Sequence, residues 1–352
     1  MPSPLPLPEP HTDSHPPLRD RLGRPLRDLR LSLTDRCNLR CPYCMPREVF
    51  GPEHPFLPES ELLSFPEMLR LAEAFLACGV RKIRLTGGEP LLRPGLISLV
   101  EQLSRLPLLE DLALTTNGTA LASLAPALKS AGLHRITVSL DALDPATFQR
   151  MSDARVRVER VLEGIDAAAT AGFAPIKINM VVRRGINEHQ IVPMAKRFAQ
   201  APFILRFIEY MDVGNSNHWR LDEVVPAAEI LARLAAEAPL EEIPPQVSGE
   251  TARRYRLRGF SGEIGVIASV TRPFCQGCSR ARISAQGLLH TCLFGRPCLD
   301  LRALLRAPQP PDREALRQTI VSAWQAREDR YSELRGRLLE ETPKTEMSLL
   351  GG

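Results

Sequence analysis

Short alternating segments and longer helical segments follow one another between Asp28 and Glu209, at intervals of about 25 residues. Strands are expected at Asp28–Thr34, Lys82–Thr86, Asp111–Thr115, Arg135–Leu140, Ile176–Val181 and Ile204–Glu209. Helices are expected around Glu67–Cys78, Leu96–Arg105, Ser123–Ser130, Val158–Ala171 and Glu188–Ala199. Regular strand–helix alternation is typical of a parallel sheet with right-handed crossovers. Six such units predict an α/β fold, an incomplete (βα)6 TIM-like barrel, rather than the closed eight-stranded kind.

The strands themselves alternate between apolar and polar residues. Buried parallel strands usually read as continuous apolar runs, but here Leu29 and Leu31 flank Arg30. Arg84 and Lys177 occupy equivalent polar positions in their strands. If helices cover the apolar face, these three cations point into the barrel, where they would repel one another unless an anion joins them. An antiparallel sheet with one solvent-exposed face would show the same alternation. The barrel is favoured because helices alternate so regularly with the strands.

The rhythm changes after Glu209, which indicates a second portion of the chain. A helix is expected near Pro226–Ala238, strands at Tyr255–Leu257 and Ile264–Val270, and a last helix near Asp312–Trp324. We therefore expect four parts: a disordered proline-rich extension over 1–21, the partial barrel over 22–225, a smaller α+β portion over 226–340, and a tail over 341–352 that ends in Gly-Gly.

Composition narrows the class of protein without naming a function. Of 352 residues, 44% are hydrophobic and 24% charged, as in an ordinary globular protein, and the net charge of +4 does not indicate nucleic-acid binding. The sequence contains neither a bilayer-spanning apolar run nor the apolar core of a signal peptide. We expect a cytoplasmic protein without membrane partners, in which eight cysteines serve metals rather than disulfides.

Three cysteines lie within eight residues directly after the first expected strand. Cys37, Cys41 and Cys44 can hold a metal or an iron–sulfur cluster but cannot all pair as disulfides. A [4Fe–4S] cluster ordinarily takes four cysteines, so three leave one iron open, which is typical of a reactive rather than a structural site. A zinc site usually uses four ligands, commonly as two CxxC pairs, and no fourth cysteine is near in sequence.

A second strand end carries Thr86-Gly87-Gly88-Glu89-Pro90. Paired glycines let the backbone approach a ligand closely and leave its amides and carbonyls available. Most Gly-Gly pairs are only turns, so this motif gains weight from the cysteine triplet one unit earlier.

The C-terminal portion contains a second triplet, Cys275, Cys278 and Cys292, which is again one ligand short. A zinc knuckle completed by His290 or Cys298 is the alternative, but beside the first triplet a second open cluster is favoured. Arg280 and Arg282 follow in an extended run and would face one way, towards the cluster or its ligand. The planar guanidinium suits phosphate oxygens, although a solvated basic turn would look the same.

Taken together, these motifs resemble the radical S-adenosylmethionine (SAM) superfamily and, within it, the GTP 3′,8-cyclase family of molybdenum cofactor biosynthesis. The likeness extends from about Leu22 to the C-terminus. The motifs that carry it are Leu22–Arg30, Thr34–Cys41, Arg84–Pro90, Thr115–Gly118, Arg206–Asn215, Cys275–Arg282 and the final Gly351-Gly352.

The resemblance implies an enzyme, a lyase that converts GTP to (8S)-3′,8-cyclo-7,8-dihydroguanosine 5′-triphosphate with SAM and two [4Fe–4S] clusters. It implies that the first triplet binds the cluster that cleaves SAM and that the second triplet binds a cluster that holds guanine. Tyr43, Gly88, Ser139 and Met211 match SAM-contacting positions, and Arg30, Arg84, Thr115, Lys177, Arg280 and Arg282 match positions around GTP.

The same resemblance implies several partners. It implies an external low-potential electron donor and hand-over of the product to cyclic pyranopterin monophosphate synthase. It also implies a monomer or homodimer, and a Gly-Gly tail that completes the site. A peptide-modifying radical SAM enzyme is the nearest alternative. A zinc-stabilised RNA-binding module is another, but it would need aromatic residues beside basic ones, and aromatic residues make up only 5% of the chain.

Overall fold

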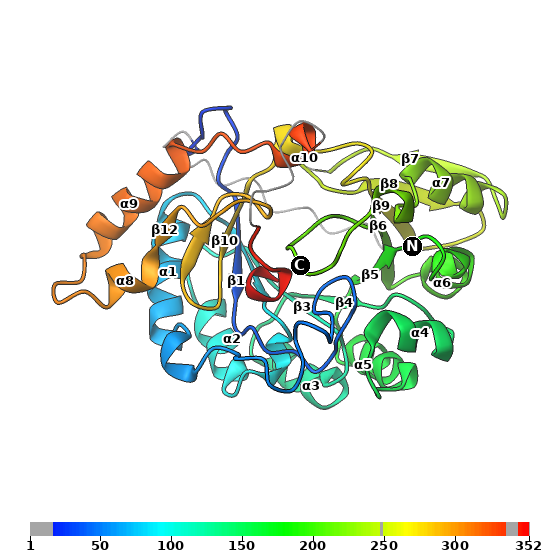
Figure 1. Ribbon diagram of the computed structural model, residues 1–352, viewed down its shortest axis with the longest axis horizontal. Helices are drawn as coiled ribbons and strands as arrows, with labels where there is room; N and C mark the ends of the chain where they lie inside the picture. Colours follow the sequence, from blue (N-terminus) through cyan, green and yellow to red (C-terminus); the bar gives the residue numbers. More distant parts are fainter. Residues whose placement is uncertain (1–16, 247–248, 336–343, 352) are drawn as a thin grey trace, which may run out of the picture.

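The computed structural model describes residues 17–246, 249–335 and 344–351 (Figure 1). The extension predicted to be disordered falls outside these ranges over residues 1–16. Its last residues do not behave as predicted, because Arg19 forms a β-bridge with Pro25 and Asp20 is buried. The folded chain therefore begins earlier than the expected boundary at Leu22.

The six expected strands are all present. They are β1 (Asp28–Ser32), β2 (Lys82–Thr86), β3 (Asp111–Thr116), β4 (Arg135–Ser139), β5 (Ile176–Val182) and β6 (Phe203–Glu209). Each pairs in parallel with the next in chain order, which rules out the antiparallel alternative. The sheet curves without closing, as expected for a partial barrel (Figure 1).

Helices cover the outside of this curved sheet. They are α1 (Phe65–Ala77), α2 (Leu96–Ser104), α3 (Leu121–Ser130), α5 (Val158–Thr170) and α6 (Ile191–Phe198). The start of α1 follows from its sequence, because Ser64 and Glu67 form a reciprocal capping box and Pro66 stands in the first turn. Sequence analysis missed α4 (Pro145–Ser152), whose signal was Asp144, a capping residue, followed by proline.

The alternation in the strands has the predicted meaning. Leu29, Leu31, Ile83 and Leu85 are fully buried in the core between sheet and helices. The intervening cations line the concave side. The apolar positions thus supply the stabilising burial, and the polar positions remain available for a ligand.

The C-terminal portion extends both edges of the same sheet. On one edge, β9 (Glu263–Ile267) pairs in parallel with β6 and is followed outward by β8 (Arg253–Leu257) and β7 (Leu240–Ile243). On the other, β10 (Arg280–Ile283) pairs in parallel with β1, followed by β11 (Leu288–His290) and β12 (Leu299–Asp300). The result is one 12-stranded sheet, ordered β12-β11-β10-β1-β2-β3-β4-β5-β6-β9-β8-β7. The other boundaries of the expected domains stay a prediction.

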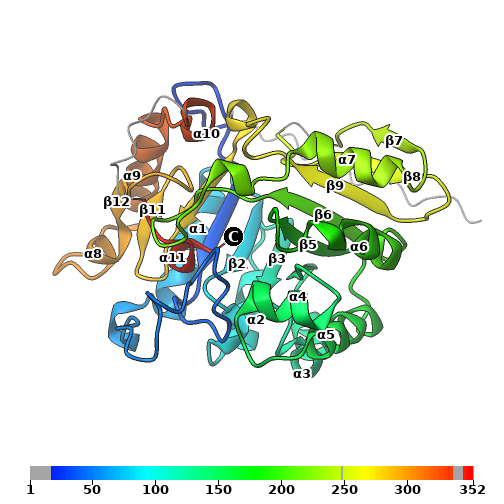
Figure 2. The same cartoon turned by 45° about the vertical axis from the view of Figure 1, so that its right-hand side comes forward.

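Two groups of helices accompany these edges (Figure 2). One edge carries α7 (Ala227–Ala235), and the other carries α8 (Leu301–Leu305), α9 (Arg313–Gln325) and α10 (Tyr331–Leu334). The last helix, α11 (Met347–Leu350), lies inside the arc of strands beside β1 (Figure 1).

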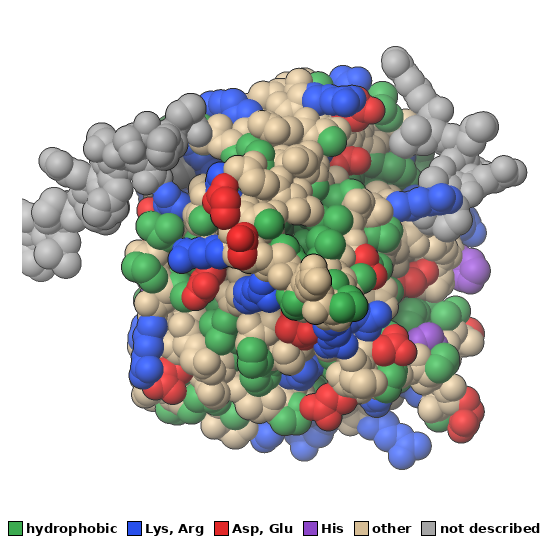
Figure 3. Space-filling model, turned by 90° about the vertical axis from the view of Figure 1, so that its left-hand side faces the viewer, with side chains coloured by type: hydrophobic (Ala, Val, Ile, Leu, Met, Phe, Trp, Pro, Cys, Tyr) green, Lys and Arg blue, Asp and Glu red, His purple; other side chains and the backbone are tan. Residues whose placement is uncertain are grey.

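The surface over α8 and α9 mixes charges of both signs. Figure 3 shows acidic and basic side chains interspersed on this face, and several form ion pairs, such as Arg306 with Glu67 and Arg317 with Glu314. No helix in the described part of the chain is long and apolar enough to cross a membrane.

Candidate active site

The two cysteine triplets lie at opposite ends of the barrel strands. The first follows the C-terminal end of β1, whereas Cys278 comes just before the N-terminal end of β10. Because β10 runs parallel to β1, with Arg280 opposite Asp28, these two ends are separated by the length of a strand. Any molecule that contacts both triplets must therefore lie inside the barrel.

The surroundings of the first triplet suit a thiolate-bound cluster. All three cysteine residues are partly exposed. Burial raises the pKa of Cys37 to about 11 and also raises those of Cys41 and Cys44, and for the latter two the neighbouring cysteines add to the shift. The Leu39 amide lies 3.4 Å from the Cys37 sulfur, and Asn117 Nδ2 lies 3.8 Å from it. Converging thiols that are costly to ionise alone are stabilised as thiolates when iron binds them.

Gly87 and Gly88 hold this cysteine loop in place. A Cβ on Gly87 would lie 2.7 Å from the Thr34 carbonyl oxygen, and one on Gly88 would lie 2.3 Å from that of Arg36. Gly88 N donates to the Thr34 carbonyl at 2.7 Å. The close backbone approach predicted from the glycine pair is thus made to the cysteine loop itself.

Glu89 stabilises the turn after Gly88. Its buried carboxylate accepts hydrogen bonds from Leu91 N, Thr116 Oγ1 and Asn117 N, at 2.7 to 3.0 Å. Burial nevertheless raises its pKa to about 7.

The four residues expected to contact SAM lie around the same end of the barrel. Tyr43 donates its hydroxyl to Asp141 at 2.6 Å, just beyond β4, and Ser139 is the last residue of β4. Met211 follows β6, and the loop after it reaches Tyr43 through Asn217 Nδ2, 3.4 Å from the Tyr43 carbonyl. Their contacts with SAM stay a prediction.

The second triplet has a different electrostatic environment. Burial would raise the pKa of Cys278, but the charges of Arg280 and Arg327 lower it to about 5. Arg280 Nη2 lies 3.3 Å from the Cys278 sulfur. A cysteine that is a thiolate at neutral pH is ready to bind iron.

The alternative zinc knuckle gains no support. His290 Nδ1 lies 3.3 Å from the Gly295 carbonyl oxygen, and Cys298 contacts the Leu289 carbonyl. Across residues 17–246, 249–335 and 344–351, no group of three or more His, Cys, Asp or Glu is arranged to hold a metal ion. A cluster differs from a single ion because each thiolate binds its own iron.

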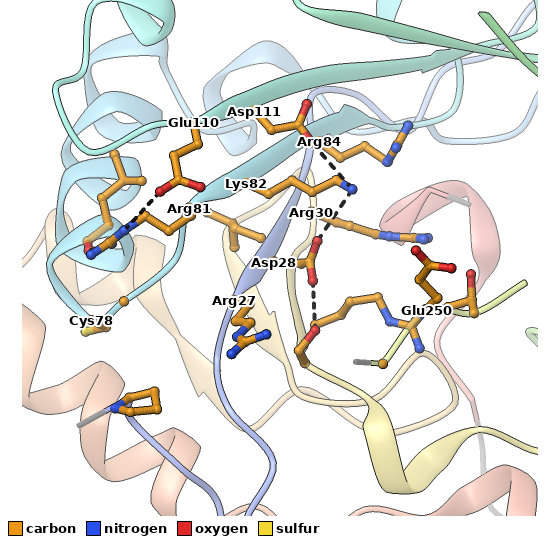
Figure 4. Close-up of a pocket in the computed structure, with 18 of the residues that line it drawn as sticks. Arg27, Asp28, Arg30, Cys78, Arg81, Lys82, Arg84, Glu110, Asp111 and Glu250 are labelled. Carbon is orange, nitrogen blue, oxygen red and sulfur yellow. Dashed lines mark hydrogen bonds and ion pairs between the residues drawn. The ribbon is translucent and has the colours of Figure 1, made fainter. Parts of the chain in front are cut away.

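A cavity of about 1610 Å³ occupies the barrel interior on the side of the second triplet (Figure 4). Four of the residues expected around GTP line it: Arg30, Arg84, Lys177 and Arg280. Figure 4 shows Arg30 and Arg84 extending into the cavity from neighbouring strands. The expectation that Arg30, Arg84 and Lys177 converge in the barrel interior is therefore confirmed, and Arg280 lies with them.

The other two expected GTP residues lie behind this lining. Arg282 is buried and its charge acts on Arg30, and Thr115 Oγ1 accepts a hydrogen bond from Arg84 at 3.0 Å. Thr137 Oγ1 accepts a second bond from the same Arg84 nitrogen, also at 3.0 Å. Thr115 thus orients Arg84 in this structure.

Further cations on the cavity wall had no predicted role, among them Lys82, Arg135 and Arg206. The alternation already contained a signal for Lys82, which stands two residues before Arg84 and shares its face. Arg206 was quoted within a motif without a role, and it donates to Asn179 Oδ1 at 2.9 Å.

Crowding of these cations shifts their pKa values downward. Burial and the neighbouring arginines lower the pKa of Lys177 to about 6 and that of Lys82 to about 7. Those of Arg84 and Arg206 fall to about 10 and about 9, with burial as the largest cause. Asp28 and Asp111 neutralise part of the charge through ion pairs with Lys82 (Figure 4).

Some of the buried donors lack a partner. Arg280 Nε and Arg282 Nε are among the buried side-chain nitrogens without a hydrogen bond in the described part of the chain. Burying such donors is costly, so a cavity of this kind favours a ligand rich in anionic oxygens.

The C-terminal tail enters the barrel from the side of the first triplet. Thr86 Oγ1 donates to the Leu350 carbonyl at 3.2 Å, and a Cβ on Gly351 would lie 2.4 Å from the Thr86 Cβ. Upstream, Glu346 accepts bonds from Asn215 N at 2.9 Å and Ser216 Oγ at 2.8 Å. The tail thus lies beside Gly87, within the candidate site. Gly352 lies outside the described residues.

Comparison with known proteins identifies two family regions. Residues 31–198 match the Radical SAM superfamily and residues 203–333 match Molybdenum Cofactor Synthesis C. A protein named GTP 3′,8-cyclase from Acidothermus cellulolyticus is 56% identical over 321 residues, covering 91% of this chain and 89% of the relative. A second one, from Xanthomonas axonopodis pv. citri, is 48% identical over 336 residues and covers 96% of this chain and 99% of the relative.

Solved structures support the fold. SuiB from Streptococcus suis, crystallised with S-adenosylmethionine, superposes with a TM-score of 0.57 at 14% identity, covering 90% of this chain and 69% of that chain. At this level of identity the likeness concerns the fold alone.

Proposed function

Because the chain belongs to the radical SAM superfamily and, within it, to the GTP 3′,8-cyclase family, we propose that it converts GTP to (8S)-3′,8-cyclo-7,8-dihydroguanosine 5′-triphosphate. This is the first step of molybdenum cofactor biosynthesis. One observation supports the assignment most directly: a cavity lined by Arg30, Arg84, Lys177, Arg206 and Arg280 lies in the barrel interior on the side of the second cysteine triplet.

The two triplets are proposed to hold two [4Fe–4S] clusters, on Cys37, Cys41 and Cys44 and on Cys275, Cys278 and Cys292. When bound, the first cluster with SAM supplies a 5′-deoxyadenosyl radical, and the second supplies an open iron for the guanine ring. Tyr43, Gly88, Ser139 and Met211 are proposed to hold SAM. Opposite placement of the triplets leaves the barrel interior for SAM beside the first triplet and for GTP beside the second.

The cations of the cavity are proposed to bind the triphosphate. Without ligand, burial and mutual repulsion lower the pKa of Lys177 to about 6 and that of Lys82 to about 7, so both lysines lose part of their charge at pH 7. An anion beside a lysine favours its charged form, so binding raises these pKa values and takes up protons. The triphosphate also supplies acceptors for the Arg280 guanidinium, which lines the cavity. The chain therefore binds substrate by relieving repulsion that it already contains.

The tail is proposed to complete the site. Residue 351 has a φ of 68° and lies where a side chain would collide with Thr86, so glycine fits there and larger residues do not. A Gly-Gly end without side chains can close the barrel near SAM and exclude water from the reacting groups.

Two alternatives make different demands on the cavity. A peptide-modifying radical SAM enzyme would have no triphosphate to pair with these cations. SuiB, which has also been crystallised with a precursor peptide, shares the fold but only 14% of the sequence. A zinc-stabilised RNA-binding module would expose aromatic residues beside basic ones. The cavity instead gathers cations in the interior of the barrel.

The remaining parts of the proposal concern the cellular context. We propose that the enzyme works in the cytoplasm, as a monomer or homodimer, with an external low-potential electron donor. Its product would pass to cyclic pyranopterin monophosphate synthase.

An anaerobic assay tests the function directly. The reconstituted enzyme is given GTP, SAM and a strong reductant, and 5′-deoxyadenosine and the cyclised nucleotide are measured together. The proposal predicts both products from the native chain and from the control Cys298→Ala, whose thiol lies outside the triplets. Cys275→Ala should lose the nucleotide product. Deoxyadenosine with unchanged GTP from the native chain would contradict the substrate, and a zinc-bound chain without either product would contradict the whole assignment.

A further inference from the structure

A cluster of buried charges lies behind the second triplet, and none of its three members lines the cavity. Asp20 and Arg24 come from the segment before β1, and Arg327 comes from the turn after α9. Asp20 Oδ2 accepts from Arg24 Nε at 2.6 Å and from Arg327 Nη1 at 3.3 Å. The three side chains are at most 1% exposed. We call this group the Asp20 clamp.

Each arginine of the clamp bonds to the backbone of a cysteine in the second triplet. Arg24 Nη1 donates to the Cys275 carbonyl at 3.1 Å, and Arg327 Nη1 donates to the Cys278 carbonyl at 2.7 Å. A neighbouring residue reaches the third segment, because Asp329 Oδ2 accepts from Thr291 Oγ1, one residue before Cys292, at 2.5 Å. All three cysteine segments are therefore tied to the same short stretches of chain.

Local geometry fixes the clamp. Asp20 Oδ1 accepts from Leu22 N and Arg24 N, which folds the segment into a turn, and Gly23 takes a positive φ of 75° in that turn. On the other side, Arg327 stacks on the Trp324 ring with its guanidinium carbon 4.5 Å from the ring centroid. Trp324 Nε1 in turn donates to the Arg24 carbonyl at 3.2 Å.

The charges of the clamp do not balance. Two fully buried guanidinium groups share one fully buried carboxylate, and the nearest further acid, Asp329, is 33% exposed and 3.6 Å from Arg327 Nε. Arg24 Nη2 and Arg327 Nε have no hydrogen-bond partner in the described part of the chain. A buried excess of positive charge is costly unless an anion lies near it. Three thiolates around a cluster would provide that anion.

We propose that the Asp20 clamp positions the second iron–sulfur cluster: it holds the backbone of the cysteine segments and places fixed positive charge beside the cluster. This inference rests on the second cluster of the proposed function. Positive charge favours the reduced, more negative form of a cluster, so the clamp raises its reduction potential. Asp20, Arg24 and Arg327 touch neither SAM nor GTP and act through the cysteines.

The test uses the full chain with Cys37, Cys41 and Cys44 replaced by serine, so that all bound iron belongs to the second triplet. Iron per chain and the midpoint potential of the cluster are measured anaerobically. Arg327→Gln should shift the potential downward and Asp20→Asn should shift it upward, because the two changes alter the net charge in opposite directions. Arg327→Lys should keep most of the potential but bind less iron. The control Arg306→Gln, which breaks a surface ion pair with Glu67 and bonds to the Ser60 and Leu62 carbonyls, should match the parent.

Potential shifts of opposite sign in Arg327→Gln and Asp20→Asn would show that the clamp acts through its charge. A purely structural role would lower the iron content of both variants without shifting their potentials in opposite directions. Equal potentials and iron content in Arg327→Gln, Asp20→Asn and the control would overturn the inference. If circular dichroism shows that Arg327→Gln does not fold, Arg327→Lys provides the test instead. Unchanged iron binding by Arg327→Lys would then contradict the proposed role of the clamp. A parent chain that binds no iron would show that the second cluster itself is wrong, and the clamp would fall with it.

Discussion

Replacing Lys177 with methionine removes one cation from the cavity while keeping a side chain of similar length. In the folded chain without ligand, burial and then Arg206 are the largest causes that lower the pKa of Lys177 to about 6, from an ordinary value of 10.5. Between these two values the unfolded chain binds more protons than the folded chain. The free energy of unfolding therefore rises with pH between these two values. Lys177 destabilises the folded chain most at the low-pH end of this window.

The size of this cost follows from the pKa difference. The interval between pH 7 and 10.5 corresponds to at most about 5 kcal/mol of stability lost at pH 7. The cavity admits water, which screens the charges, so we expect about 2 kcal/mol. Lys177→Met should gain that amount at pH 7, and the gain should shrink to nearly zero by about pH 10. The same variant should bind GTP at least about tenfold more weakly, because it loses a charged hydrogen bond.

The assay is anaerobic urea unfolding of the cluster-loaded enzyme, followed by pulse proteolysis at pH 7, 8 and 9, with GTP binding measured by calorimetry. Lys196→Met serves as the control, because Lys196 pairs with Glu237 on the surface, and its removal should change stability by less than about 0.5 kcal/mol. A Lys177→Met variant that is less stable at pH 7, or whose advantage does not change with pH, would refute the reasoning. Unaltered GTP affinity would refute the placement of the triphosphate.

Three further changes test other parts of the structure. Gly351→Ala should release the tail and lower turnover, because its Cβ would collide with Thr86. The control is Gly259→Ala, which has a similar positive φ but open space around the added Cβ. Limited proteolysis measures release of the tail, and the cyclase assay measures turnover. Glu346→Gln should speed hydrogen exchange across α11, since it weakens the bonds to Asn215 and Ser216; unchanged exchange would contradict the anchoring role. Glu209→Gln should destabilise the fold by about 1–3 kcal/mol in urea, because the Glu209 carboxylate accepts bonds from the amides of residues 227, 270 and 271. A loss below about 0.5 kcal/mol would show that these amides find other partners.

Local sequence patterns predicted much of the fold. Alternation in the strands predicted both their positions and the side on which Arg30, Arg84 and Lys177 lie, because a strand places successive side chains on opposite faces. Caps such as the Ser64 box mark helix starts in the same local way. Where the local signal was short, as at α4, the prediction failed, since eight residues give little periodicity to detect.

The candidate site was predicted in its chemistry more than in its arrangement. Cysteine spacing identified two triplets, but the spacing does not say at which end of the barrel each one lies. That depends on the pairing of β10 with β1, which are separated by some 250 residues of sequence. The positions of Arg135 and Arg206 on the cavity wall could not be predicted either, because their neighbours across the barrel come from distant strands.

The sequence by itself determined most elements of the barrel, the face of each strand, the two cysteine triplets and the resemblance to a family, because each of these depends on short-range spacing. The tertiary structure alone decided that the C-terminal strands extend both edges of the barrel sheet, that the tail enters the barrel beside Gly87, and that Asp20, Arg24 and Arg327 meet behind the second triplet. These features depend on contacts between segments up to about 300 residues apart, and the burial that makes such contacts strong exists only once the chain has folded.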